Sequence, residues 1–142
     1  MQGPSAHSVR LPYFGAFDFL WIESDRNEIY LKGYATRRAL SSDAEAAVRS
    51  QYPEANIHNQ VELLPPDMQD TMIRLAALDA LDSTGDFERD GRPKIHIIVK
   101  DRRVELFGSV DSRGLSAKAE RICSSIRGVE RIRNLLEVTK KD

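Results

Sequence analysis

The most constraining feature of the sequence is an internal repeat. A shift of 75 positions aligns residues 29–63 with residues 104–138 without a gap, and about eleven of roughly thirty-five positions are identical. The identical positions, in first-copy numbers, are Leu31, Gly33, Arg38, Leu40, Ser41, Ala44, Glu45, Ser50, Ile57, Asn59 and Glu62. Unrelated sequences would share about one position in seventeen. The pattern therefore predicts a duplicated structural unit.

The second copy is expected to fold as two strands, a helix and a third strand. Alternating apolar residues predict a hairpin of strands over 94–100 and 104–110. Apolar residues then recur at helical spacing over 115–126, and residues 130–139 return as a strand.

The first copy matches this order. It predicts strands over 17–23 and 28–35, a helix over 40–48 and a strand over 57–64. An apolar segment, Leu11-Pro12-Tyr13-Phe14-Gly15, precedes it without an evident leading helix.

Several residues are placed to cap the two predicted helices. Ser112 or Asp111 can cap the start of the second helix, and Gly128 can end it. In the first helix, Ser42 and Glu45 have the spacing of a capping box.

The segment between the copies predicts a further helix. Two prolines stop the preceding strand, and Asp67 can cap a helix over 68–82, which a polar loop at 83–93 follows. We therefore expect an α+β protein of two repeats, 1–64 and 65–142, each a small three-stranded mixed sheet packed on helices. The order is αββαβ in the second repeat, whose core spans 94–139.

No arrangement of histidine or cysteine is typical of catalysis or metal binding. His7, His58 and His96 lie on different segments, and none has ligand spacing to another His, Cys or carboxylate. Cys123 lies on the apolar face of its helix, where we expect an inert core thiol. We expect no enzymatic activity, no cofactor and no metal.

Three carboxylates recur every four residues in the polar loop, at Asp82, Asp86 and Asp90. The spacing is not that of an EF-hand loop, and no bidentate glutamate follows at the required place. The interpretation we favour is a solvated acidic loop.

Nucleic-acid binding is not favoured by the composition. Lys+Arg 21 against Asp+Glu 22 gives a net charge of -1, whereas nucleic-acid binding draws on a surplus of Lys and Arg. The order of elements also resembles the KH module, but the Gly-x-x-Gly tetrapeptide that clamps RNA in that module does not occur here.

No apolar run approaches the roughly 20 residues that a membrane span needs, and the first twelve residues lack signal-peptide character. We expect a soluble protein. Its location is the periplasm or envelope if a signal segment was removed, and otherwise the cytoplasm.

The repeated elements resemble the BON domain, named for bacterial osmotic-stress and nodulation proteins. The resemblance rests on a hairpin ending in Gly33 or Gly108, a helix that follows it, and a closing strand with Asn59 or Asn134. The family ending Gly-Val-x-x-Val-x-Asn is best met from Gly128 onward. In the first copy, Pro-Glu replaces the Gly-Val pair and the leading helix is not evident.

These motif residues have a structural interpretation. We expect Gly33 and Gly108 to allow close backbone approach or a bulge, and Asn59 and Asn134 to bond a neighbouring turn. The resemblance implies a non-enzymatic module associated with phospholipid surfaces and with the envelope under osmotic stress.

The charge is divided unevenly along the chain. About 12 basic and about 7 acidic residues follow position 93, against about 9 and about 15 before it, so the two parts carry roughly +5 and -6. The basic part predicts contact with anionic phospholipid headgroups. The candidate residues are Lys118, Arg121, Arg127, Arg131 and Arg133. Oppositely charged copies also permit protein contact or self-association, and a solvated surface without a partner remains open.

Overall fold

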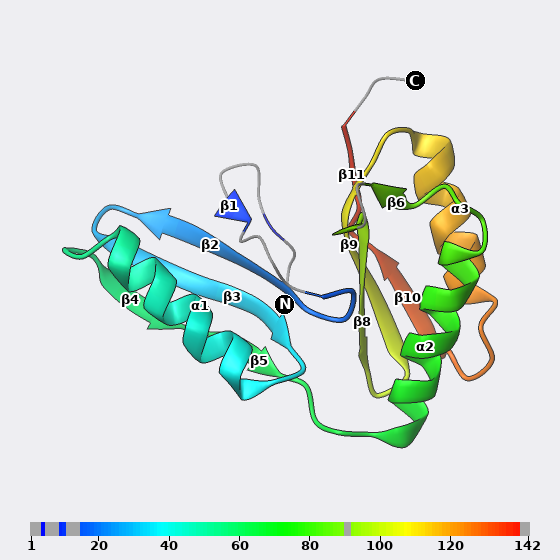
Figure 1. The fold of residues 1–142 in the computed structure, drawn as a ribbon, viewed down its shortest axis with the longest axis horizontal. Helices are drawn as coiled ribbons and strands as arrows, with labels where there is room; N and C mark the ends of the chain where they lie inside the picture. Colours follow the sequence, from blue (N-terminus) through cyan, green and yellow to red (C-terminus); the bar gives the residue numbers. More distant parts are fainter. Residues whose placement is uncertain (1–3, 5–8, 11–14, 90–91, 140–142) are drawn as a thin grey trace. The chain divides into compact units, whose positions relative to one another are not determined.

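In the computed structural model, the described residues are 4, 9–10, 15–89 and 92–139, and they form two compact units. The first unit comprises residues 1–14 and 18–65, and the second comprises 15–17 and 66–142. Both combine helices with mixed sheets, so the predicted α+β class is confirmed (Figure 1).

The first unit is a mixed sheet with one helix. Its strands are β1 (Val9–Arg10), β2 (Phe19–Asp25), β3 (Glu28–Ala35), β4 (Asn56–Asn59) and β5 (Glu62–Leu63). β2 and β3 form an antiparallel hairpin, β1 pairs with β2, and β4 and β5 run parallel to β3. Helix α1 (Arg38–Gln51) connects β3 to β4, as a crossover between parallel strands requires.

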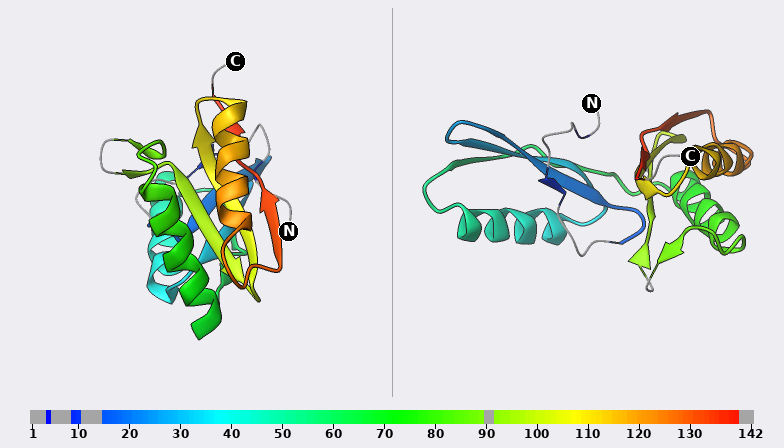
Figure 2. Two further views of the ribbon diagram at one scale, coloured as in Figure 1. Left: turned by 90° about the vertical axis from the view of Figure 1, so that its right-hand side faces the viewer. Right: turned by 90° about the horizontal axis from the view of Figure 1, so that it is seen from above.

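The second unit has the order α2, β8, β9, α3, β10, with short additional strands. Its elements are α2 (Met68–Asp82), β6 (Glu88–Arg89), β7 (Arg92–Pro93), β8 (Ile95–Lys100), β9 (Arg103–Val110), α3 (Arg113–Ser124), β10 (Arg131–Asn134) and β11 (Glu137–Val138). β8 and β9 are antiparallel, whereas β10 and β11 run parallel to β9. Both helices lie on one face of this sheet, side by side (Figure 2).

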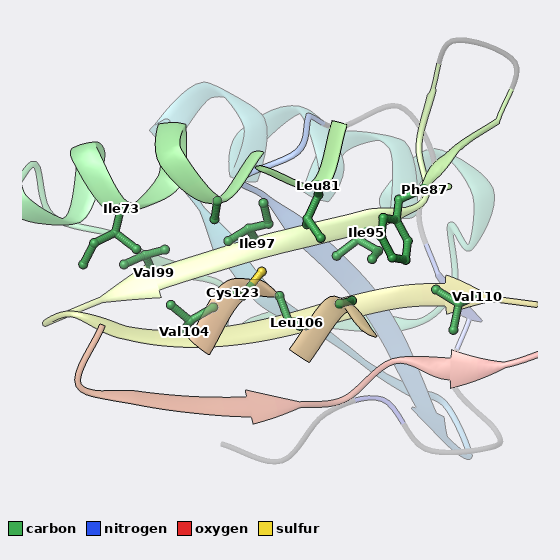
Figure 3. Packing of buried hydrophobic residues seen from close by; sticks show 12 residues of the cluster. Ile73, Leu81, Phe87, Ile95, Ile97, Val99, Val104, Leu106, Val110 and Cys123 are labelled. Atoms are coloured by element: carbon green, nitrogen blue, oxygen red, sulfur yellow. The ribbon is translucent and has the colours of Figure 1, made fainter. Parts of the chain in front are cut away.

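Alternate strand residues of the second unit build its core beneath these helices (Figure 3). Ile97 and Leu106 are fully buried at the centre of this core. Ala77 from α2 and Cys123 from α3 belong to the same buried cluster. Burying such side chains contributes about 25 cal/mol per Å² of apolar surface removed from water. The apolar faces of the two helices and of the sheet thus pack together in one core layer.

Two glycines occupy corresponding places near the open end of the two hairpins, where Gly33 pairs with Leu20 and Gly108 pairs with Ile95. Gly33 has φ 122 and Gly108 has φ 117. A Cβ atom at Gly33 would overlap the carbonyl oxygen of Phe19, and one at Gly108 would overlap that of Lys94. Both positions therefore combine a glycine-favouring backbone with a close approach of the neighbouring strand.

In each unit, one asparagine interrupts the last strand, and the two asparagines make the same kinds of hydrogen bond. The Asn59 Oδ1 accepts from the N–H of Val61 at 3.0 Å, and its Nδ2 donates to the Ser41 Oγ at 3.0 Å. The Asn134 Oδ1 accepts from the N–H of Leu136 at 3.0 Å, and its Nδ2 donates to the Ser116 Oγ at 2.9 Å. Each single strand that we predicted over 57–64 and 130–139 is thus divided in two by a side-chain-bonded turn.

The predicted capping box in α1 is wrong. The helix begins at Arg38, so Ser42 lies inside it and its hydroxyl donates back to the Arg38 carbonyl at 3.2 Å. Glu45 accepts from Asn59 and Arg49 instead. In α2 and α3 the caps are Asp67 and Ser112, which accept from the N–H groups of Asp70 and Leu115.

Candidate functional site

A groove opens in the second unit between the N-terminal half of α2 and the loop that joins α3 to β10. Its volume is about 870 Å³. Helix α2 supplies Gln69, Met72, Ile73 and Ala76, the β8–β9 turn supplies Arg102, and residues 125–130 supply the opposite wall. Apolar side chains dominate the lining, and two arginines, Arg102 and Arg127, lie among them. Such a groove fits an apolar or amphipathic ligand.

A buried carboxylate fixes the geometry at one end of the groove. Asp70 is 1% exposed, and its two oxygens accept from the backbone N–H groups of Asp101 at 3.0 Å and Arg102 at 2.8 Å. Both turn residues have positive φ, 50° and 62°. Asp70 therefore ties α2 to the β8–β9 turn and positions Arg102 at the groove.

The Arg102 side chain is surrounded by acceptors. Its Nε lies 3.3 Å from the Glu130 Oε2, and its Nη1 lies 3.4 Å from the Gln69 Oε1 and 3.9 Å from the Asp67 Oδ2. One guanidinium thus faces several carboxylates, which hold it along the groove wall.

Next to the groove, α2 exposes large apolar side chains. Met68, Met72 and Leu75 are 80%, 65% and 57% exposed, at the spacing i, i+4, i+7. The opposite face of α2 is the one buried against the sheet through Ile73 and Ala77. The spacing of residues 68, 72 and 75 in the sequence is the signal for this exposed apolar stripe, which we did not predict from the sequence.

Three of the five predicted basic residues lie at the groove end of the second unit. Arg121 lies in the last turn of α3, Arg127 lines the groove, and Arg131 begins β10. All three residues are exposed, and none of their guanidinium groups has a hydrogen-bond or ion-pair partner among the described residues. Figure 1 shows the connection between the end of α3 and the start of β10 at the lower end of this unit.

The other two predicted residues have acidic partners elsewhere. The Lys118 Nζ lies 2.6 Å from the Asp86 Oδ2, and the Arg133 Nη1 lies 3.4 Å from the Glu105 Oε2. Their charges are partly compensated, and the structure does not place them at the groove.

The charge division changes when it follows the structural units. Helix α2 and the loop after it belong to the second unit, which then carries 15 basic and 14 acidic residues, a net charge of +1. The first unit carries 6 basic and 8 acidic residues, a net charge of -2. The predicted opposition of two strongly charged copies is therefore wrong, because the acidic segment 66–93 belongs to the same unit as the basic residues, where Lys118 pairs with Asp86.

The two described histidines and the single cysteine do not line the groove. The His58 Nε2 lies 2.8 Å from the Glu28 Oε1 and its ring stacks on Tyr30, while the His96 Nδ1 lies 2.9 Å from the Gly15 carbonyl. Burial raises the pKa of the Cys123 thiol to about 12, which leaves it unreactive. His7 and Asp90 lie outside the described residues.

Within the described part of the chain, no group of three or more His, Cys, Asp or Glu residues could hold a metal ion. In the same residues, no helix has the length and apolar character needed to cross a membrane.

Two solved structures resemble the chain, both of CdsD, a structural protein of the type III secretion system of Chlamydia trachomatis. One, its C-terminal domain, matches with 13% identity and a TM-score of 0.39 over 84% of this chain and 56% of that chain. The other matches with 13% identity and a TM-score of 0.40 over 85% and 54%. The present chain thus spans little more than half of either. No curated protein matches.

A family model matches the second unit from α2 to its last strand. The match is to the BON domain and covers residues 69–140, half of the chain, including the whole groove. BON domains are associated with envelope and osmotic-stress proteins and with phospholipid binding, which points to a non-catalytic module. With this match, and with the αββαβ order of the second unit, the chain belongs to the BON domain family.

Proposed function

We propose that the second unit binds the surface of anionic phospholipid membranes through its groove end. One observation carries the proposal: exposed Met68 and Met72 lie on the helix that forms the groove, at the end of the unit that carries Arg121, Arg127 and Arg131. Within the described part of the chain, the guanidinium groups of these three arginines have no hydrogen-bond or ion-pair partner. Apolar side chains beside exposed cations are the combination that an anionic interface favours.

The two kinds of residue have different roles in this contact. Each arginine near an anionic surface contributes about 1 kcal/mol at low salt, an attraction that falls off within a Debye length. The methionines supply apolar area that leaves water when they enter the interface. Binding is therefore expected to need both anionic lipid and the apolar tip.

The proposed location is the periplasm or envelope, in association with osmotic stress, as for other BON proteins. The function proposed there is binding without catalysis.

We also propose that residues 1–64 form a second, divergent BON-like unit. The support is positional: Gly33 and Gly108 share a positive φ, and Asn59 and Asn134 make the same turn-and-helix bonds, at the 75-residue shift of the repeat. The first unit lacks a counterpart of α2 among its described residues.

Co-sedimentation with vesicles tests the lipid proposal. The full chain is expected to sediment with vesicles that contain phosphatidylglycerol and not with pure phosphatidylcholine vesicles, and added salt should weaken the binding. The variant R121Q/R127Q should lose most of the binding. The matched control K118Q/R133Q removes the same charge away from the groove and should retain it. Equal binding to both lipids, or equal loss in both variants, would overturn the proposal.

The second candidate function is self-association or protein binding. Its earlier basis, oppositely charged repeats, is weak now that the units carry -2 and +1. The apolar stripe on α2 supports it instead, because exposed contiguous apolar side chains mark interaction sites.

A further inference from the structure

The exposed stripe of α2 continues beyond its apolar part. The same spacing that relates Met68, Met72 and Leu75 leads next to Asp79 and Asp82, both exposed. Neither carboxylate has a hydrogen-bond or ion-pair partner among the described residues. The stripe is therefore apolar in its first half and anionic in its second.

A cation stands beside the apolar half. Arg127 lines the groove together with Gln69 and Met72, and its guanidinium lacks a partner within the described part of the chain. One end of the stripe thus carries an unpaired positive charge and the other end carries two unpaired negative charges. If a second copy of the stripe lies antiparallel to the first, the positive end of each copy faces the negative end of the other.

We propose that the stripe is covered by α2 of a second copy of this chain, packed antiparallel across a two-fold axis near Leu75. In this arrangement Leu75 meets Leu75 of the other copy. Asp79 and Asp82 approach Arg127 of the other copy, and the reciprocal contact forms by symmetry. A parallel arrangement would instead place like charges together.

An anionic membrane fits the charges of the whole stripe less well than a second copy of the chain does. An anionic surface that accepted Met68 and Met72 would repel Asp79 and Asp82 if the helix lay flat on it. The second copy pairs those carboxylates with cations.

This inference rests on the second candidate function, self-association, and does not require that the proposal of lipid binding be correct. Because the apolar contact consists of a few side chains, the dimer is expected to be weak, with a dissociation constant of about micromolar size. Arg127 serves both contacts, so lipid binding and dimer formation are expected to compete.

Charge reversal tests the geometry in the absence of lipid. Sedimentation velocity of the full chain from about 1 to 300 μM should show a monomer–dimer equilibrium. The variants D79R/D82R and R127E should each weaken it at least about tenfold, because each places like charges together twice. An equimolar mixture of the two variants should restore the dimer, since both contacts of the mixed pair are then attractive. The control D43R/E54R makes the same net charge change as D79R/D82R in the first unit and should not alter the equilibrium.

Disulfide trapping tests the axis. L75C should form an intermolecular disulfide under mild oxidation, because the axis brings the two copies of this residue together. The control A46C, exposed on α1, should not, and buried Cys123 does not compete.

A monomer at all concentrations, a dimer that ignores the charge reversals, or a variant mixture that stays monomeric would each overturn the proposal. Loss of vesicle binding in R121Q/R127Q would still support the lipid function, so the two failures are distinguishable.

Discussion

The carboxylate of Asp70 accepts a hydrogen bond of 2.8 Å from the backbone N–H of Arg102. The same carboxylate also binds the N–H of Asp101 at 3.0 Å, so one buried side chain satisfies both donors of a left-handed turn. The contact joins two segments 32 residues apart and holds α2 on the sheet, where it forms one wall of the groove.

Replacing Asp70 by Asn should destabilise the second unit by about 1–3 kcal/mol. The amide keeps the shape but offers one acceptor oxygen, and its NH2 group would face a backbone N–H in a buried site. Urea unfolding followed by circular dichroism measures the change. Asp79→Asn, exposed on the same helix, should shift the midpoint little. Equal stability of both variants would contradict the role assigned to Asp70.

Substituting Ala for Gly33 or Gly108 should cost more than about 2 kcal/mol in the affected unit, because the new Cβ meets a backbone carbonyl and the positive φ is strained. Gly114 provides the control. It lies in α3 and a Cβ there meets no atom nearer than 3.7 Å, so Gly114→Ala should be neutral or stabilising by about 0.5 kcal/mol. Thermal melting of the three variants decides the matter, and a tolerated Gly108→Ala would show that the strand pair can separate.

The sequence predicted the arrangement of elements well because the periods of the apolar residues agree with the fold. Ile95, Ile97 and Val99 alternate in the sequence and all enter the core, and the leading helix runs over the predicted residues. We expected Asn59 and Asn134 to bond a neighbouring turn, and each accepts from a backbone N–H two residues on. The resulting breaks in the closing strands were not predicted.

The site was predicted only in part, for a physical reason. Positive charge counted along the chain cannot reveal that Lys118 is paired with Asp86, whereas the side chains of Arg121 and Arg127 have no acidic partner in the part of the chain that the structure describes. The charge was also counted from position 94, although the predicted second repeat already included the acidic helix over 68–82. The apolar stripe through Met72 was visible in the sequence, but its exposure depends on which face of α2 meets the sheet.

The thiol of Cys123 should report unfolding of the second unit. The side chain is fully buried, and burial raises its pKa to about 12, so the reactive thiolate is scarce in the folded state. Ellman's reagent should react with the native chain no faster than the unit opens, and at full speed in denaturant. Rapid labelling of the native protein at neutral pH would contradict the packing of α3 described above.

The first unit should lose stability as the pH falls. The hydrogen bond from Asn59, and next the one from Arg49, lower the pKa of Glu45 below its usual value. A carboxylate whose pKa is depressed on folding stabilises the folded state above its unfolded pKa, and this contribution is lost as the pH falls through the folded pKa. The melting temperature of Glu45→Gln should therefore lie below that of the parent at pH 7 and approach it at about pH 3. Asp43→Asn, an exposed neighbour on α1, should behave like the parent at pH 7.

Glu130 should restrain binding at the groove end. Its Oε2 lies 3.3 Å from the Arg102 Nε, so it holds a guanidinium that could otherwise meet an anionic headgroup. In the vesicle assay, Glu130→Gln is expected to strengthen binding to phosphatidylglycerol vesicles by about threefold to tenfold, the effect of freeing roughly one cation near the surface. Glu120→Gln makes the same charge change on the exposed side of α3 and should have a smaller effect. Equal effects of the two variants would show that net charge alone governs binding, and an unchanged affinity in Glu130→Gln would exclude Arg102 from the lipid contact.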